Sequence, residues 1–253
     1  MLAAVKKGDG KKVAELIRQP GFNVNMVVDE DGYTLLHYIC DWGNGRSFLI
    51  PLLLAHPDID VNANSEVGET PFHLACSNGH FSCVRELLKD SRVNVNDVDC
   101  REHTPLLNAA ANGHLEVIQL WIASGREMHL GIPGEWVTDA IRGAKERDET
   151  EVVTLLERFK SDPTKTRSEV RLELDLLDDL AAEMFALVVF VSDGLLRIKR
   201  TTPSPAARYL KIASRLPLEL QMLLCFRVVG SAKEIIPGTE REAAFRELAR
   251  RLW

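Results

Sequence analysis

Residues 68–88, GETPFHLACSNGHFSCVRELL, constrain the fold of this chain more than any other stretch. Thr70 suits the start of a helix because its hydroxyl oxygen can accept a hydrogen bond from the open amides of a first turn. Pro71 follows at the first helical position, where a missing amide hydrogen costs nothing. Gly79 stands where that helix must end, and apolar residues in 84–88 then recur at helical spacing. The stretch therefore predicts two short helices joined by a tight turn.

The same pattern recurs along the first half of the chain. Three threonines and three glycines open and interrupt equivalent segments at offsets of 36 and 34 residues, namely Thr34, Thr70 and Thr104 and then Gly43, Gly79 and Gly113. Each unit closes on an asparagine that follows a valine: Asn25, Asn62 and Asn96. A period near 34 residues with helix–turn–helix content is typical of stacked repeats.

These repeats resemble the ankyrin-repeat family over about residues 1 to 130, more weakly to 160, and not beyond. The residues that carry the resemblance are Gly68, Thr70, Pro71, His73, Ala75, Gly79 and His80, and then Thr104, Pro105, Leu106, Ala109, Ala110, Gly113, His114, Glu116 and Val117. The resemblance implies an all-α solenoid of helix–turn–helix repeats with short β-hairpin loops. It also implies a scaffold that binds proteins.

We predict an ankyrin-repeat domain at 1–165 and a C-terminal helical region at 166–253. The first consists of an N-terminal cap at 1–30, repeats at about 31–64, 67–99 and 101–133, and a degenerate repeat at 134–160. In the third repeat, Glu102 stands where the hairpin calls for glycine, which places its geometry in doubt, and Leu107 replaces histidine. In the fourth, Thr138, Ala140 and Ala144 keep the register, while the apolar residues of 152–156 arrive one residue late.

The polar segment 160–167, KSDPTKTR, contains Pro163 and no apolar residue, which predicts a connector between domains. Residues 168–192 then read as one long amphipathic helix. Three further helices are expected at 205–216, 217–229 and 240–253. These helices could form a small bundle or cover the last repeat, whose hydrophobic face must not stay exposed.

The charge of the chain is uneven. The net charge is −6, and residues 1–165 carry 17 basic and 25 acidic side chains against 14 and 12 in the remainder. The negative charge argues against general nucleic-acid binding, and an acidic solenoid favours a basic protein partner. The longest apolar run, 184–191, is too short to span a bilayer, so no membrane association is expected. We expect a monomer.

The five cysteines are scattered without the spacing of a disulfide framework. An odd count of this kind is typical of the reduced thiols of the cytosol or nucleus. The N-terminus, MLAAVKKGD, carries no secretory signal. We therefore expect a cytoplasmic and/or nuclear location.

One constellation has the residue types of a zinc site. His73, Cys76, His80 and Cys83 read H-x2-C-x3-H-x2-C. The repeat pattern explains both histidines, however, and a turn separates the two helices, so we favour a structural role. The sequence contains no glycine-rich phosphate loop, HExxH or GxSxG motif. We expect no catalytic activity, no metal and no cofactor.

In ankyrin arrays, hairpin tips and the inner-helix face form a concave groove that binds partners. Carried onto this sequence, the resemblance assigns this role to Tyr33, Tyr38, Asp41, Trp42, Glu69, Ser77, Asn78, Glu102, His103, Asn108 and Asn112. Tyr33, Tyr38 and Trp42 stand out because aromatic anchors often dominate binding energy. Trp42 could equally well pack against the two-residue insertion near Gly45. The asparagines that close the repeats are expected to satisfy backbone groups of a turn, although such asparagines are sometimes hydroxylated in this family.

The C-terminal region supports an alternative function. Residues 216–220, LPLEL, and 245–249, FRELA, weakly resemble an F-box, which would make the chain a substrate adaptor of a cullin-type ubiquitin ligase. The same residues also suit the start of an ordinary helix. Thr202 and Ser204 each precede a proline, as in proline-directed phosphorylation sites, although Ser204 could instead cap the following helix.

Overall fold

The structure is a computed structural model that describes residues 1–43, 45–132, 139–174 and 176–192, together with 209, 212–213, 215–216, 220–222, 224–225 and 244. The chain divides into two compact units, Met1–Val170 and Arg171–Trp253. Every regular element in the described residues is a helix, which confirms the all-α fold class.

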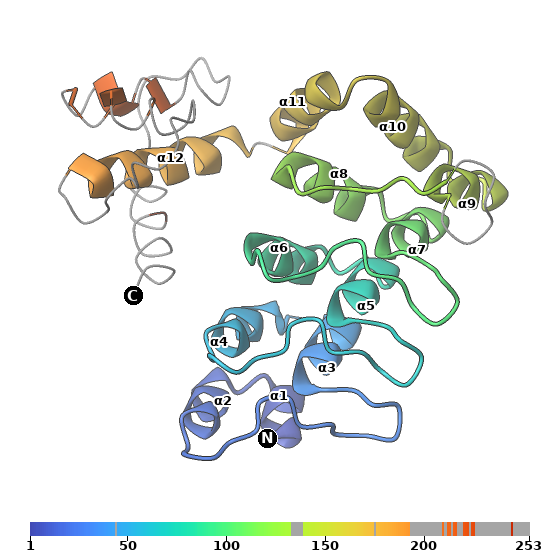
Figure 1. Ribbon diagram of the computed structural model, residues 1–253, viewed down its shortest axis with the longest axis vertical. Helices are drawn as coiled ribbons and strands as arrows, with labels where there is room; N and C mark the ends of the chain where they lie inside the picture. The colour runs from blue at the N-terminus through green and yellow to red at the C-terminus, as the bar shows by residue number, and fades with distance from the viewer. Residues whose placement is uncertain are drawn as a thin grey trace. The chain divides into compact units, whose positions relative to one another are not determined.

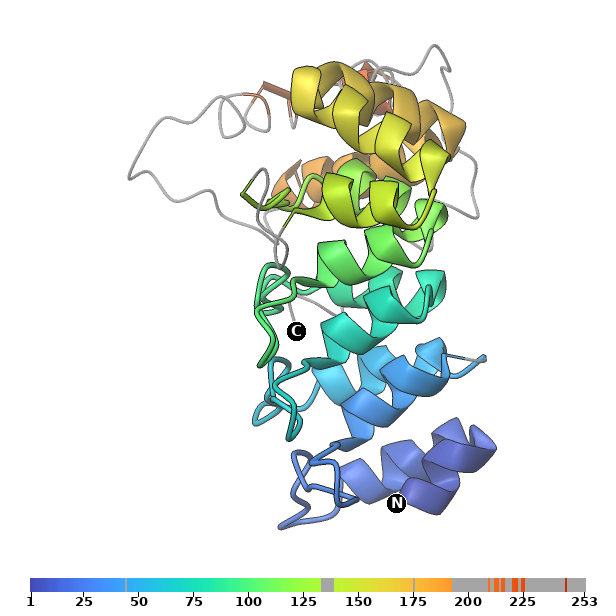
Figure 2. The same cartoon turned by 90° about the vertical axis from the view of Figure 1, so that its right-hand side faces the viewer.

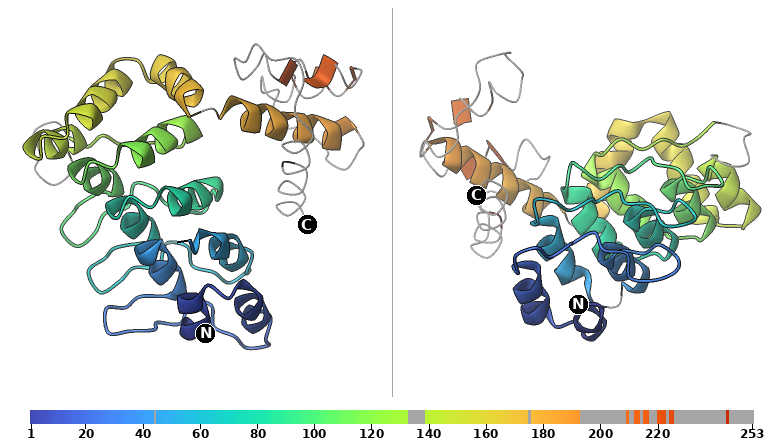
Figure 3. Two further views of the ribbon diagram at one scale, coloured as in Figure 1. Left: turned by 180° about the vertical axis from the view of Figure 1, so that it is seen from behind. Right: turned by 60° about the horizontal axis from the view of Figure 1, so that its bottom comes forward.

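The first unit is a stack of helix pairs (Figure 1). The pairs are α1 (Leu2–Lys7) with α2 (Gly10–Ile17), α3 (Leu35–Trp42) with η1 (Ser47–Leu49) and α4 (Ile50–Leu54), α5 (Pro71–Ser77) with α6 (Phe81–Lys89), α7 (Pro105–Ala111) with α8 (Leu115–Ser124), and α9 (Ala140–Glu146) with α10 (Thr150–Ser161). The odd-numbered helices pack on one another as an inner row, and the others pack as an outer row. Figures 2 and 3 show the same stack from the side and from behind.

Long loops connect successive pairs and project to one side of the stack (Figure 2). Each described loop folds back on itself through a backbone hydrogen bond, from Val28 N to Tyr33 O, from Ser65 N to Glu69 O, and from Asp99 N to His103 O. Neighbouring loops are also joined, because Glu66 N donates to Asp31 O at 2.9 Å and Cys100 N donates to Val67 O at 3.0 Å. The expected hairpin loops are therefore present as hydrogen-bonded turns.

The core of this unit lies between the inner and outer rows. Its largest fully buried side chains include Trp121 of α8 and Phe72 of α5, whose rings meet edge to face at 5.0 Å. This geometry favours aromatic pairs, since the positive edge of one ring meets the negative face of the other. The pair ties two successive repeats together through their interior.

The third hairpin keeps the geometry of the others despite its glutamate. Glu102 adopts φ 63, in the left-handed region that Gly32 and Gly68 occupy at φ 78. Its amide donates to Asp99 O at 2.9 Å, as the amide of Gly68 donates to Ser65 O. The hydrogen bonds of the repeat therefore impose the turn, and Glu102 carries the strain of an unfavourable backbone region.

The fourth repeat is a regular helix pair. Relative to the third repeat it contains one extra residue, which lies before its first helix. Asp139 caps α9, because its carboxylate accepts from Arg142 N at 3.1 Å, as Thr104 caps α7. Glu149 N then donates to Ala144 O, as His114 N donates to Ala109 O. Asp139, rather than Thr138, is thus the equivalent of the threonine caps, and Ala144 shares the one-residue shift. Thr138 itself lies outside the described residues.

The expected connector at 160–167 is helical instead. Helix α11 spans Pro163–Glu173, and the carboxylate of Asp162 accepts from Lys165 N at 2.9 Å. Asp followed by Pro is a favourable helix start, so the proline initiates a helix here. The long helix expected at 168–192 is accordingly two helices, α11 and α12 (Leu177–Ser192).

Helix α11 belongs mostly to the repeat unit. Thr166 and Val170 are buried, and Arg167 Nε donates to the carbonyl oxygen of Ile122 in α8 at 3.1 Å. The last turns of the solenoid are therefore covered by the chain immediately after α10.

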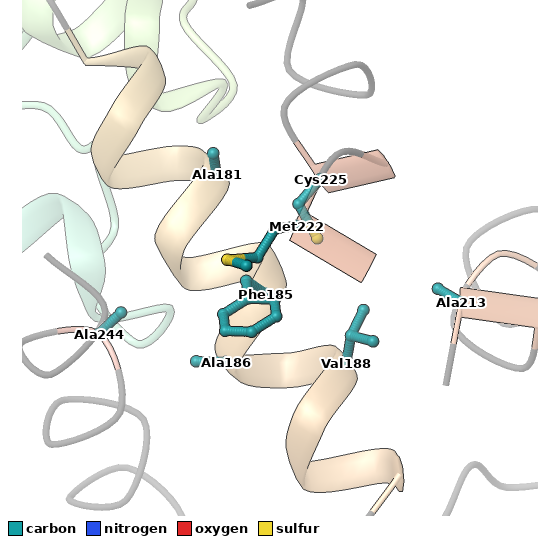
Figure 4. Packing of buried hydrophobic residues seen from close by; sticks show 8 residues of the cluster. All are labelled: Ala181, Phe185, Ala186, Val188, Ala213, Met222, Cys225 and Ala244. Atoms are coloured by element: carbon teal, nitrogen blue, oxygen red, sulfur yellow. The ribbon is translucent and has the colours of Figure 1, made fainter. Parts of the chain in front are cut away.

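The second unit has a hydrophobic cluster of its own (Figure 4). Its buried members come from α12 and from later parts of the chain: Ala181, Phe185, Ala186, Val188, Ala213, Met222, Cys225 and Ala244. Tyr209 packs against this cluster and places its hydroxyl 3.5 Å from the sulfur of Cys225. Most residues of the three helices expected after 205 lie outside the described residues, as do Thr202, Ser204 and most of the F-box-like motifs.

Candidate partner-binding surface

Tyr33, Tyr38 and Trp42 form a continuous aromatic cluster. The rings of Tyr33 and Tyr38 meet edge to face at 5.9 Å, and those of Tyr38 and Trp42 at 4.9 Å. Tyr38 and Trp42 lie one turn apart on α3, and Tyr33 comes from the preceding hairpin loop. All three are partly exposed. The structure thus brings together the three aromatic residues that the sequence placed on one hairpin and one helix.

Asp29 fixes one ring of this cluster. The hydroxyl of Tyr38 donates to Asp29 Oδ2 at 2.7 Å, and Asp29 Oδ1 accepts from the Tyr33 amide at 2.9 Å. The hydrogen bond to Asp29, together with burial, raises the pKa of Tyr38 to about 12. Burial acts to raise the pKa of Asp29, but the bonds from Tyr38 and from backbone amides lower it overall. The ring of Tyr38 is therefore preorganised beside a carboxylate.

Two cations of the chain itself face the aromatic cluster. Lys6 Nζ lies 5.8 Å from the centroid of Tyr38 and 5.1 Å from that of Trp42, and the Arg46 guanidinium lies 5.6 Å from Trp42. Cations are attracted to aromatic faces by the ring quadrupole. Because Arg46 directly follows Gly45, Trp42 also packs against the insertion. It is thus both a partly exposed aromatic residue and a packing residue.

The hairpin loops beside this cluster form an acidic hairpin surface. Its acidic members are Asp29, Glu30, Asp31, Glu66, Glu69, Asp97, Asp99 and Glu102. The same loops also contain the basic residue Arg101 and the neighbouring His103. Burial and the charges of Asp99 and Asp41 raise the pKa of Glu69. Burial and the negative charges of Glu69, Asp41 and their neighbours raise the pKa of Tyr33 to about 12. The charges of neighbouring carboxylates thus contribute, after burial, to both shifts.

Four of the expected partner-binding residues also join adjacent repeats. Asn78 Nδ2 donates to Asp41 Oδ1 at 3.1 Å, and Asn112 Nδ2 donates to the Ser77 carbonyl at 2.9 Å. These contacts hold the end of each inner helix to the next one. A sequence signal for this role exists, because Asn-Gly-His recurs at 78–80 and 112–114. Asn78 and Asn112 were assigned to the binding surface without regard to this recurrence.

The remaining expected residues lie on two hairpin loops and on α7. Glu69, Glu102 and His103 belong to the hairpin loops, and Asn108 is half-buried on α7. His103 Nδ1 lies 3.6 Å from Asp99 Oδ2, and the same carboxylate accepts from the His103 amide at 2.8 Å. The acidic hairpin surface is therefore held in shape by its own side chains as well as by its backbone.

Two buried histidines connect successive hairpins. His73 Nδ1 accepts from the Thr70 amide at 3.2 Å, and its Nε2 lies 3.2 Å from the His103 carbonyl oxygen. His37 makes the same contacts with Thr34 and Glu69. In the third repeat, Leu107 fills this position and packs closely against Gly143 of α9, where any side chain would collide with it. A hydrophobic contact thus replaces the hydrogen bond.

Three of the four side chains of the zinc-like constellation have other partners, and Cys76 is buried in the core. His73 joins Thr70 to His103, while His80 Nε2 lies 2.8 Å from the Asp41 carbonyl oxygen and Cys83 donates to the Ile39 carbonyl at 3.7 Å. Across the described ranges, no three His, Cys, Asp or Glu side chains converge as a metal site. These residues act in the stacking of repeats.

The asparagines that close each repeat clamp the next one. Asn62 Nδ2 donates to Arg92 O at 2.8 Å, and its Oδ1 accepts from Asn94 N at 2.7 Å. Asn25 and Asn96 repeat this pair of bonds one unit earlier and one unit later. The predicted structural role is therefore observed, although the turn that each asparagine satisfies belongs to the following repeat.

The described part of the chain has no helix both long enough and apolar enough to cross a membrane. The surface found here consists of hairpin tips and the side of α3, with exposed charge and partly exposed aromatic rings. Such a surface can bind another molecule by electrostatic, hydrogen-bonding and aromatic contacts.

Comparison with known proteins agrees with this architecture. The family model described as ankyrin repeats (3 copies) matches residues 1–97 and again 44–130, which together make about half of the chain. The SMC5-SMC6 complex localization factor protein 1 of Bos taurus is 33% identical over 134 residues, which are 50% of this chain and 12% of the relative. The human transient receptor potential cation channel subfamily A member 1 is 36% identical over 100 residues, 38% of this chain and 9% of the relative.

A third relative, the ankyrin repeat and KH domain-containing protein mask-1 of Caenorhabditis elegans, is 27% identical over 123 residues, 48% of this chain and 4% of the relative. The chain thus spans no more than 12% of the length of these curated relatives. The chain belongs to the ankyrin-repeat family.

Proposed function

We propose that this protein is a non-catalytic binding module that recognises a basic segment of a partner protein. The observation that carries the proposal is the coincidence of the aromatic cluster with the acidic hairpin surface. Negative potential steers a basic partner toward the surface, and partly exposed aromatic rings provide contact area where it arrives.

The surface is preorganised, which favours binding. Hydrogen bonds connect the hairpins to one another and to the inner helices, and Asp29 orients Tyr38. Binding of a partner therefore costs little conformational entropy on this side of the interface. Burial raises the pKa of Glu69, and the negative charges of Asp99 and Asp41 add to this shift, so a bound cation would relieve part of the repulsion.

The comparisons give this role a biological context. The bovine and human relatives are named as localization factors of the SMC5-SMC6 complex, and each is 33% identical to this chain over 134 residues. We propose by analogy that this chain recruits or positions a protein partner, in the nucleus or the cytoplasm, and that it acts as a monomer.

The test is capture of partners from cell lysate with the full chain. One bait is the wild-type chain, and a second carries Glu66→Lys and Glu69→Lys on the acidic hairpin surface. A matched control carries Glu116→Lys and Glu151→Lys, which make the same charge change at exposed positions of α8 and α10.

Partners retained by the wild-type and control baits but lost by the hairpin variant support the proposal, and basic segments should be enriched among them. Equal capture by all three baits would contradict it. Direct binding of an oligolysine peptide, weakening as salt rises, is the second expected result.

A ubiquitin-ligase adaptor is the second candidate function. It is favoured by the separate hydrophobic cluster of the second unit and by Leu220 of the F-box-like motif, which is 46% exposed. Capture of a cullin and its adaptor by the wild-type chain, lost on Leu220→Arg, would establish this role. Capture without any ligase subunit would leave the plain binding module.

A further inference from the structure

Lys6 has an unusual position for an exposed lysine. Helix α1 packs on α3, and Lys6 is on its last turn, where its ammonium faces both Tyr38 and Trp42. Within the described part of the chain this ammonium has no ion pair or hydrogen bond. It lies over the two aromatic rings.

Arg46 provides an internal contrast. Its Nε donates to the Val5 carbonyl at 3.1 Å and one Nη to the Lys6 carbonyl at 2.7 Å, so it joins α1 to the end of α3. Arg46 is a structural cation fixed by the backbone. The Lys6 side chain has no such restraint, and a long flexible side chain held only by an exposed cation–π contact can be exchanged for another cation.

The charges around the site favour such an exchange. Asp29 bonds to the hydroxyl of Tyr38, and the backbone of Asp41 lies on the same helix between Tyr38 and Trp42. The site therefore offers two aromatic faces and the nearby carboxylate of Asp29, which together suit an ammonium group. The Lys6 ammonium shows that the space accommodates one.

We propose that the Tyr38–Trp42 face is the receptor for a lysine side chain of the partner protein, and that Lys6 occupies it in the free protein and is displaced on binding. The N-terminal helix thus supplies an internal competitor that weakens binding of the partner. This inference rests on the proposed function, because it names the side chain through which a basic partner is recognised.

The test compares three full-length proteins in their binding to an oligolysine peptide: the wild type, Lys6→Ala and Lys7→Ala. Lys6 and Lys7 are both exposed on α1, and each substitution removes one positive charge. The general electrostatic effect is therefore matched, while the contact with the rings is lost in Lys6→Ala alone. We expect Lys6→Ala to bind the peptide about two- to fivefold more tightly than Lys7→Ala.

A second readout follows Lys6 directly. Ring currents from Tyr38 and Trp42 should shift the NMR signals of the Lys6 ε-methylene protons upfield in the free protein. Saturation with oligolysine should move them toward random-coil values, whereas a fully acetylated peptide should not.

The outcomes separate the two proposals. If the peptide binds all three proteins with a salt-dependent affinity, but Lys6→Ala matches Lys7→Ala and the Lys6 signals do not move, the displacement is wrong and the basic-partner surface stands. If none of the three proteins binds the peptide at any salt concentration, both proposals are overturned.

Discussion

The imidazole ring of His80 occupies the space beside Gly43 that any side chain at that position would need. Its Nε2 lies 2.8 Å from the carbonyl oxygen of Asp41, at the end of the same inner helix. His114 covers Gly79 in the same way and approaches the Ser77 carbonyl, and Glu149 covers Gly113. Helices α3, α5 and α7 are therefore followed by glycine both because the chain takes a positive φ there and because a side chain of the next repeat lies over that position.

Substitution of Gly79 tests this second role. Gly79 and Gly8 share φ 67, but a Cβ at Gly79 would collide with the His114 ring, while Gly8 has nothing within 4 Å. Gly8→Ala should cost about 1 kcal/mol for backbone strain alone, and Gly79→Ala about 2 to 3 kcal/mol. Urea denaturation of both variants measures the difference, and equal losses would show that the contact with the histidine has no energetic consequence.

Glu102→Gly should stabilise the repeat unit. The wild-type glutamate sits at φ 63, a region that costs an L-residue free energy and costs glycine none. Allowing for the greater entropy of glycine in the unfolded chain, we expect a gain of about 0.5 to 1 kcal/mol in the free energy of unfolding. Conversely, Gly68→Ala at the equivalent position of the preceding hairpin should lower the free energy of unfolding, since a Cβ there would lie 2.9 Å from the Cys100 amide nitrogen. A loss of stability in Glu102→Gly would argue against a strained hairpin.

Stability should fall as the pH drops below about 6.5, the ordinary pKa of histidine. Burial lowers the pKa of His37 and His73, although their hydrogen bonds to backbone oppose part of this effect. The unfolded chain therefore binds protons before the folded protein does, so stability present above the unfolded pKa is lost as the pH falls toward the folded value. Chemical denaturation from pH 8 to pH 5 measures the slope.

The variant His37→Gln/His73→Gln should reduce this slope while lowering stability at neutral pH. Because Leu107 replaces the histidine of the third repeat, hydrogen exchange at low pH should accelerate more in α3 and α5 than in α7. If hydrogen exchange accelerated equally in α3, α5 and α7, groups other than His37 and His73 would be responsible for the pH dependence.

Asn62→Ala should cost about 1 to 3 kcal/mol, because two backbone groups of the next repeat lose their side-chain partner. Asn23→Ala is the comparison, since the Asn23 side chain accepts a single local bond from the Asn25 amide. It should cost under about 1 kcal/mol. Thermal unfolding of the two variants separates the clamp between repeats from an ordinary turn, and similar losses would contradict this assignment.

Helix α11 should be needed for the stability of the solenoid. A fragment ending at Glu173 should unfold at a higher temperature than one ending at Asp162, because the shorter one exposes the apolar surface that Thr166 and Val170 cover and loses the bond from Arg167 to Ile122. Arg167→Ala in the longer fragment should lower the free energy of unfolding by about 1 to 2 kcal/mol. Identical melting of the two fragments would show that the solenoid ends at α10.

Local features of the sequence determined the repeat architecture. A threonine cap, a proline in the first turn and a glycine after the inner helix are signals that act within one helix pair, and their recurrence in most of the repeats was sufficient to place the stack. The aromatic residues of the candidate surface could also be found this way, because one hairpin and one helix turn bring Tyr33, Tyr38 and Trp42 together. Polar composition at 160–167 was misleading, since Asp162 and Pro163 together start a helix.

Only the tertiary structure decided how the repeats hold one another and what faces the aromatic cluster. The clamps of Asn62 and Asn78, the ring of His114 over Gly79 and the contact of Leu107 with Gly143 each join positions about one repeat apart. Lys6 reaches Tyr38 and Trp42 from a different helix. Such contacts depend on the packing of one helix pair on the next, and a repeat pattern specifies the pairs but not the side chains that meet between them.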